Sequence, residues 1–170
     1  MKLSFVAAAT TLFLSTMGVM ADDTYTAPSP ADSSLGLSSS LDGTYGVVIE
    51  DYTESYYRKA KRDTISNLET HCSSDGALEV TLSDGVLTDA NGRIGSIVSN
   101  NQFQFDGPPP QSDYIYAAGW AVDDDGILYL GEYDDFYKCL SGDFYNLYYQ
   151  SIDNEACTEV QIKLVSLTDC

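Results

Sequence analysis

One acidic stretch holds the side chains that could most readily carry chemistry. It consists of Asp123, Asp124, Asp125, Glu132, Asp134 and Asp135. Oxygen ligands of this kind bind Ca²⁺, and two carboxylates on either side of a glycosidic bond can hydrolyse it. The stretch does not match the Asp-x-Asp-x-Asp-Gly calcium loop, and Asp125-Gly126 is typical of a hairpin turn. We therefore interpret these acids as a solvated turn and predict neither a metal site nor a catalytic site there.

Catalysis through an activated nucleophile has one possible histidine base in this chain, His71. A Ser-His-Asp or Cys-His arrangement would have to use this ring. The neighbouring Cys72 is expected to be oxidised, so it offers no free thiol. We expect His71 to be a solvated or capping residue, and we predict no catalytic residue and no cofactor.

The cysteines indicate covalent cross-links rather than a metal centre. They are Cys72, Cys139, Cys157 and Cys170. An even number in an oxidising compartment favours two disulfides, and no Cys-x-x-Cys spacing suggests zinc. All three pairings remain possible on sequence alone. We favour Cys72 with Cys170 and Cys139 with Cys157, because the two ends of an all-β domain would meet where its sheet closes.

The first residues are typical of a secretory signal peptide. Residues 1–21 begin with the charged Lys2, continue as an apolar stretch too short for a confident membrane span, and end at Ala21 in a small-residue cleavage site. No second apolar run of membrane length and no lipid-anchor signal follow. We expect cleavage after Ala21 and a secreted, extracellular product with no membrane partner.

A dense basic cluster interrupts an acidic chain. Arg58, Lys59, Lys61 and Arg62 are half of its 8 basic residues, while the formal net charge is −18 at pH 7. Such a charge repels nucleic acid and anionic membranes, so a polyanion-binding patch is excluded. A solvated charge run is the other alternative. In a secreted chain, however, Lys61-Arg62 is a site for a kexin-type processing protease, and we predict cleavage after Arg62.

Composition divides the chain at this processing site. Residues 22–43 are rich in Ser, Thr, Pro and Asp, so we expect disorder and O-glycosylation there. Residues 44–57 contain more β-forming side chains and could pair weakly with the domain, but an unstructured segment is the interpretation we prefer. We predict a Ser/Thr/Pro-rich pro-segment over residues 22–62 and one domain over residues 63–170.

Short β-rich runs separated by turn residues fill the predicted domain. Asp-Gly and Asn-Gly pairs supply the positive φ of tight hairpins, and residues 159–164 alternate polar and apolar side chains as a half-buried strand does. The sequence of residues 84–87 recurs in similar form at residues 125–128, a repeat that suits a β-trefoil. We predict an all-β fold, a small disulfide-stapled antiparallel β-barrel with trefoil-like symmetry, and keep a β-sandwich as the alternative.

Aromatic residues are numerous, with 13 Tyr, 6 Phe and a single Trp. Most of them are expected to fill the core and to pack across strands. A few tyrosines on one face could instead stack on sugar rings. This keeps a secreted, lectin-like carbohydrate-binding module without a structural role as an alternative function.

One long motif resembles the C-terminal domain of the fungal PIR cell-wall mannoproteins. Residues 84–111, with the sequence DGVLTDANGRIGSIVSNNQFQFDGPPPQ, carry the likeness, and YAAGW, FYKCLSGDFYNLYYQ and the terminal SLTDC extend it. The cysteine spacing is similar to that of the family and differs by one residue in the middle gap. The likeness covers residues 58–170 and includes the Lys-Arg site.

The resemblance implies a structural constituent of the fungal cell wall, without enzymatic activity, that contributes to wall organisation. Its implied partners are β-1,3-glucan and other wall proteins. The family attaches to glucan through a glutamine in repeats of the form Gln-x-x-Asp-Gly-Gln-x-Gln, and this sequence contains none. Gln102 and Gln104 belong to the domain motif instead. We therefore expect retention by disulfide exchange, by non-covalent glucan contact, or simple secretion.

Overall fold

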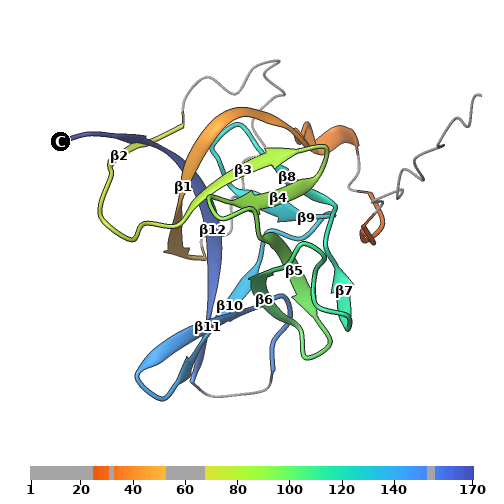
Figure 1. The fold of residues 1–170 in the computed structure, drawn as a ribbon. Coiled ribbons are helices and arrows are strands. Elements are labelled where there is room, and N and C mark those ends of the chain that lie inside the picture. Colours follow the sequence, from red (N-terminus) through yellow and green to blue (C-terminus); the bar gives the residue numbers. More distant parts are fainter. Residues whose placement is uncertain (1–24, 31–32, 53–67, 153–155) are drawn as a thin grey trace, which may run out of the picture.

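The computed structural model describes residues 25–30, 33–52, 68–152 and 156–170, and these residues form an all-β fold (Figure 1). One 3₁₀ turn, η1 at Ser33–Leu35, is the only helical element among them. The strands are β1 (Leu41–Asp51), β2 (Thr70–Cys72), β3 (Glu79–Ser83), β4 (Val86–Asp89), β5 (Ile94–Val98), β6 (Gln102–Asp106), β7 (Tyr114–Tyr116), β8 (Trp120–Val122), β9 (Leu128–Leu130), β10 (Phe136–Ser141), β11 (Phe144–Tyr148) and β12 (Cys157–Thr168). The all-β prediction is confirmed. In the ranges described, no helix has the length and apolar character that a membrane span requires.

The main sheet closes on itself. Its strands are hydrogen-bonded in the order β1-β3-β4-β5-β6-β11-β10-β12, and β1 also pairs with β12, which completes a ring of antiparallel strands. β2 adds to β12 in parallel outside this ring, β7 pairs with β5, and β8 and β9 form a separate hairpin. This closure agrees with the closed sheet expected from the sequence. The ring of pairings fits a barrel or a sandwich-like arrangement, so the trefoil-like barrel stays a prediction.

The core is centred on Trp120, which is fully buried. Its indole Nε1 donates a hydrogen bond to the carbonyl of Gly95 at 2.9 Å, which satisfies the one polar atom of the ring. The rings of Phe103 and Phe136 lie 4.9 and 6.1 Å from it, measured between centroids. Burying three large rings together supplies much of the apolar area on which a domain of this size depends.

Two disulfides join strands that are already neighbours. Cys139 of β10 and Cys157 of β12 are direct partners in the antiparallel register, with Cα atoms 4.0 Å apart. Cys72 ends β2 and is bonded to Cys170, just beyond the end of β12. These are the two pairs that the sequence analysis favoured. Cys139 is almost fully buried, whereas Cys72 and Cys170 are exposed.

Residues expected to be unstructured form part of the ring. β1 (Leu41–Asp51) lies between β3 and β12, and its apolar side chains Leu41, Tyr45, Val47 and Ile49 pack against the core. The expectation of disorder over residues 22–43 and the preference for an unstructured segment over residues 44–57 are wrong for the described residues. The physical reason is that the apolar side chains of β1 are buried by residues from elsewhere in the chain.

The predicted processing positions lie outside the described residues. This applies to Ala21, Lys61 and Arg62, so both cleavage sites stay predictions. The structure does show that residue 63 is not the edge of the folded sheet, because β1 precedes it in the chain. The predicted processing boundary is therefore not the boundary of the folded sheet.

Candidate functional site

The acidic turn between β8 and β9 is held together by its own first carboxylate. Asp123 Oδ1 accepts hydrogen bonds from the backbone N–H groups of Asp125 at 3.0 Å and Ile127 at 2.9 Å. Burial raises the pKa of Asp123, and the neighbouring Asp125 and Asp124 carboxylates raise it further, while the two backbone N–H groups lower it. No group of three or more acidic, His or Cys residues in the described ranges is arranged to hold a metal ion. Asp123 therefore acts as an internal cap for the hairpin turn.

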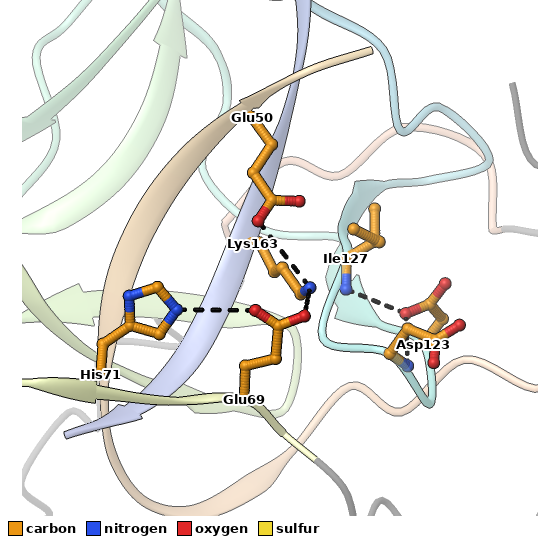
Figure 2. A network of polar contacts seen from close by, with 7 residues as sticks. Glu50, Glu69, His71, Asp123, Ile127 and Lys163 are labelled. Carbon is orange, nitrogen blue, oxygen red and sulfur yellow. Dashed lines mark hydrogen bonds and ion pairs between the residues drawn. The ribbon is translucent and has the colours of Figure 1, made fainter. Parts of the chain in front are cut away.

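A second polar cluster surrounds Lys163 of β12 (Figure 2). The lysine is buried, and its Nζ lies 2.6 Å from Glu69 Oε1 and 3.9 Å from Glu50 Oε1. His71 Nε2 lies 3.5 Å from the other oxygen of Glu69. The cluster thus joins β1, the residue before β2, and β12.

The charges of this cluster stabilise one another. Burial lowers the pKa of Lys163, but the hydrogen bond with Glu69 and the nearby Glu50 carboxylate outweigh it, so that the pKa lies above its usual value. The hydrogen bonds with Lys163 and then His71 lower the pKa of Glu69. A lysine held in its charged form is no nucleophile. His71 is partly exposed and pairs with Glu69, which fits the solvated role expected for it.

A cavity of about 540 Å³ lies between the N-terminal segment and the loops around β8. Its lining residues are Ala27, Pro28, Ser29, Pro30, Gly36, Leu37, Ser39, Asp84, Gly85, Ala118, Gly119, Trp120, Ala121 and Gly131. Asp84 is the one carboxylate among them. Glycoside hydrolysis requires a pair of carboxyl groups across the scissile bond, so this lining does not provide that arrangement.

The hairpin of β10 and β11, Phe136–Tyr148, carries an exposed apolar tip, and we name it the aromatic hairpin. Leu140, Phe144 and Tyr145 are 46%, 60% and 58% exposed. Leu140 and Tyr145 are cross-strand partners, and β11 pairs with β6 only at Leu147 and Tyr148. The tip consequently extends beyond the ring, at the lower left of Figure 1.

Two contacts brace the aromatic hairpin. The Cys139–Cys157 disulfide ties its first strand to β12, and Lys138 Nζ lies 5.5 Å from the centre of the Tyr145 ring. A fixed aromatic side chain can offer its face to a sugar ring at a small cost in conformational entropy. Sequence analysis predicted that some tyrosines could do this but did not say which ones. Tyr145 and Leu147 are two residues apart and therefore lie on the same face of β11. Leu147 pairs with β6 and packs against the core, whereas Tyr145 lies beyond this pairing and is exposed.

A known protein family matches the middle of the chain. Residues 85–160 match the family model described as the cell wall mannoprotein PIR1-like C-terminal domain. This part of the chain is similar to the PIR1-like C-terminal domain. The match includes the aromatic hairpin, the acidic turn and the Cys139–Cys157 disulfide.

Two of the relatives that this chain matches are cell wall proteins of Saccharomyces cerevisiae. Over 107 residues, or 63% of the chain, the identity with the cell wall mannoprotein CIS3 is 60%, and the aligned part is 47% of that protein. Over 99 residues, or 58% of the chain, the identity with the cell wall protein PIR5 (strain RM11-1a) is 59%, and the aligned part is 34% of that protein. No solved structure matches the chain.

The PIR resemblance inferred from residues 84–111 is confirmed by these matches. The chain spans about half of the length of CIS3 and about a third of that of PIR5. Both relatives are named as proteins of the cell wall, which supports the secreted, cell-wall localisation that the PIR1-like domain implies.

Proposed function

We propose that this protein is a non-enzymatic structural constituent of a fungal cell wall, which contributes to wall organisation by associating with β-glucan and with other wall proteins. The observation that carries the proposal is its identity of 60% with a cell wall mannoprotein over 107 residues. Asp84 is the only carboxylate among the residues that line the cavity, which argues against glycoside hydrolysis there.

The aromatic hairpin is the surface that we propose for glucan contact. Phe144 and Tyr145 expose large apolar faces, which can stack on sugar rings. The net charge of −18 favours a neutral polymer over a polyanion as the partner. Because no internal glutamine repeat is present, this contact is proposed to be non-covalent.

Sedimentation with insoluble β-1,3-glucan tests this contact. The secreted full chain is expected to sediment with the glucan, and Tyr145→Ala together with Phe144→Ala should greatly reduce the bound fraction. Tyr133→Ala is the matched control, since Tyr133 is 48% exposed but lies outside the aromatic hairpin. Equal binding by the double variant and the wild type would contradict the role of the hairpin. Thermal unfolding of each variant shows whether the fold is intact.

A carbohydrate-binding module without a structural role is the second candidate, and the exposed aromatic tip favours it. Binding to short, soluble oligosaccharides separates the two, since a soluble module should bind them whereas a structural constituent should require the insoluble polymer. Extraction of walls with hot detergent, then reductant, then mild alkali shows how the protein is held, and a non-covalently held protein should leave with the detergent. Recovery mainly in alkali would contradict our inference that the repeat ester is absent.

Processing completes the proposed function. We propose removal of the signal peptide after Ala21, O-glycosylation of the Ser/Thr-rich residues 22–43, and cleavage by a kexin-type protease after Arg62. Mass spectrometry of the secreted protein should find a chain beginning at Asp63. A single chain with an intact N-terminus at Asp22 would remove the kexin-type protease from the list of partners.

A further inference from the structure

The register of β10 and β12 fixes which of their side chains lie on the outer face of the sheet. Phe136 of β10 and Val160 of β12 are register partners, and both are fully buried in the core. Successive residues of a strand point to opposite faces, so Tyr137 lies on the outer face. Its register partner Glu159 lies beside it there and is exposed.

The same reasoning applies to β6 and β11, on the other side of β10. Phe103 belongs to the core, and its register partner Leu147 packs against the core. The next register pair, Gln102 and Tyr148, therefore points outward. Tyr148 is also the register partner of Tyr137. Two separate core pairs thus place both tyrosines side by side on one face.

Four side chains consequently form one row across four neighbouring strands, which Figure 1 shows in its lower half. The row consists of Gln102 of β6, Tyr148 of β11, Tyr137 of β10 and Glu159 of β12. Neighbouring strands lie about 4.8 Å apart, so the row is about 14 Å long. Its two central tyrosines are partly exposed, and the row is longer than a single sugar ring.

β11 extends this row toward the tip of the aromatic hairpin. Phe144 and Asn146 are four and two residues before Tyr148 in the same strand, so they share its face, whereas Tyr145 lies on the opposite one. Phe144 is 60% exposed. Four residues of a strand span about 14 Å. We name the six outward residues the outer platform: Gln102, Tyr137, Phe144, Asn146, Tyr148 and Glu159.

Two contacts hold the outer platform in one conformation. Cys139 is the register partner of both Asn146 and Cys157, so its disulfide ties β10 to β12 within this face. The hydroxyl of Tyr137 donates a hydrogen bond to the Asp135 carboxylate. Burial raises the pKa of Tyr137, and the charges of Asp135 and then Glu159 raise it further, so the ring stays neutral. A surface fixed in this way loses little conformational entropy when it binds a ligand.

The composition of the outer platform indicates a neutral ligand rich in hydroxyl groups. Its three aromatic rings can stack on the apolar faces of sugar rings, and the amides of Gln102 and Asn146 can both donate and accept hydrogen bonds. None of the six residues is basic, since Lys138 is the register partner of the core-facing Leu147 and lies on the other face. Glu159, at one edge, is the single charge, so the platform suits neither a polyanion nor a densely charged polycation.

We propose that the outer platform binds one extended, neutral polysaccharide chain, which lies across β6, β11, β10 and β12 with sugar rings stacked on Tyr148 and Tyr137. The inference rests on the glucan contact proposed above and refines it. The contact is centred on one face of the aromatic hairpin, to which Phe144 belongs and Tyr145 does not. A chain of several sugar units is the ligand, because one sugar ring would cover only part of the platform.

Sedimentation of the full secreted chain with insoluble β-1,3-glucan tests the platform. Tyr148→Ala and Tyr137→Ala should each lower the bound fraction several-fold, whereas Tyr133→Ala, outside the platform, should not change it. Tyr145→Ala alters an exposed tyrosine on the opposite face of the same hairpin and should lower the bound fraction less than Tyr148→Ala does. An equal loss from these last two variants would contradict the choice of face.

The wild type separates the two levels of the proposal. If it sediments and the variants of Tyr137 and Tyr148 sediment equally well, the platform is wrong while the glucan contact stands. If the wild type stays in solution, the glucan contact itself is wrong, and the platform with it.

Footprinting keeps the test independent of whether the variants fold. The wild type, free or bound to insoluble β-1,3-glucan, is exposed to hydroxyl radicals, and mass spectrometry measures the oxidation of each aromatic side chain. Tyr137, Phe144 and Tyr148 should react several-fold less in the bound state, while Tyr133 should react equally in both states. Unchanged oxidation of Tyr137 and Tyr148 on binding would overturn the proposal, even where their variants bind poorly.

Discussion

β1 and β2 both pair with β12, yet they are held in opposite ways. β1 makes six antiparallel register pairs with β12, and three of its side chains beside them, Tyr45, Val47 and Ile49, pack against the core. β2 makes three parallel pairs, all of its residues are exposed, and the Cys72–Cys170 disulfide attaches it. Packing holds the first strand, and a covalent bond holds the second.

The Cys72–Cys170 disulfide thus lies where packing is weak, whereas the Cys139–Cys157 disulfide joins two strands of the ring. A strand with exposed side chains and few partners opens easily, so a disulfide adds most to its persistence. β1 is retained by pairing on both edges and has no cross-link. Lys163 of β12 contacts the carboxylates of Glu50 and Glu69, so one side chain connects the two regions.

Removing the Cys72–Cys170 disulfide should have the largest effect. The double change Cys72→Ser and Cys170→Ser should lower the free energy of unfolding by about 4 kcal/mol, because the bond closes a loop with a sequence separation of 98. The pair Cys139→Ser and Cys157→Ser, with a separation of 18, should cost about 3 kcal/mol. Urea denaturation measures both. A larger loss of stability for the shorter loop would contradict the view that each disulfide stabilises the protein by restricting the unfolded chain.

The stability cost of truncating one side chain in each strand should distinguish the packing of β1 from that of β2. Ile49→Ala should lower the free energy of unfolding by about 2 kcal/mol, at the lower end for a core truncation because Ile49 is only partly buried. His71→Ala in β2 should change it by less than about 0.5 kcal/mol, as expected for an exposed position. Equal costs, measured by urea denaturation, would mean that β2 packs as tightly as β1.

The close approach of β1 to β12 at Gly46 gives a smaller expected effect. Gly46→Ala should destabilise the protein by about 1 kcal/mol, because the new Cβ would lie 2.7 Å from Leu167 Cδ2 and the leucine must shift. A Gly→Ala change at Gly76 cannot serve as the control, because Gly76 has a positive φ of 83° and an alanine there would strain the backbone. Gly46→Ala combined with Leu167→Ala should show a coupling between the two positions in a double-mutant cycle. Strict additivity of the two changes would argue against the contact.

The ion pair that joins the two regions should give the smallest effect, and that effect should depend on pH. The folded pKa of Glu69 is lowered, so its contribution is present above the unfolded pKa of about 4.3 and is lost as pH falls through the folded value. The folded pKa of Lys163 is raised, so its contribution is present below about 10.4 and is lost as pH rises through the folded value. Lys163→Met should remove the contribution of Lys163 and the larger part of that of Glu69, while the hydrogen bond of Glu69 with His71 remains.

Thermal unfolding of the wild type and of Lys163→Met across pH provides the measurement. The advantage of the wild type should be greatest near neutral pH and should shrink as pH falls through the folded pKa of Glu69. Glu50→Gln is the matched control, because Glu50 lies farther from Lys163 and should alter the profile less than Glu69→Gln does. A constant difference between wild type and Lys163→Met across this range would mean that the lysine contributes through its packed stem alone.

Local sequence patterns predicted the class of fold because each pattern acts within a few residues. The Asp-Gly and Asn-Gly turns and the alternation in residues 159–164 correctly indicated hairpins and a strand. The same reasoning failed for residues 41–51. The β-forming side chains of residues 44–57 were recognised, but an unstructured segment was preferred, because the burial of β1 depends on β3 and β12, which are distant in sequence.

The candidate surface was predictable in kind but not in position. Sequence analysis indicated that some tyrosines could be exposed for stacking, and Tyr145 is exposed while Tyr149 is buried. Burial raises the pKa of Tyr149 to about 12, with the nearby Tyr116 and Tyr133 adding to the shift. Tyr145 and Tyr149 lie close together in one aromatic-rich run, and the sequence gave no sign that one is exposed and the other buried. That difference depends on where the paired strands end.

The sequence by itself determined the strand-forming pattern, the need for cross-links in a secreted domain and the PIR-type motif, because these depend on local chemistry and on residue types. Only the tertiary structure decided which strand closes the ring and which side chains remain exposed. Those outcomes depend on pairing between residues far apart in the chain, and pairing partners have no signature in the local sequence of either strand.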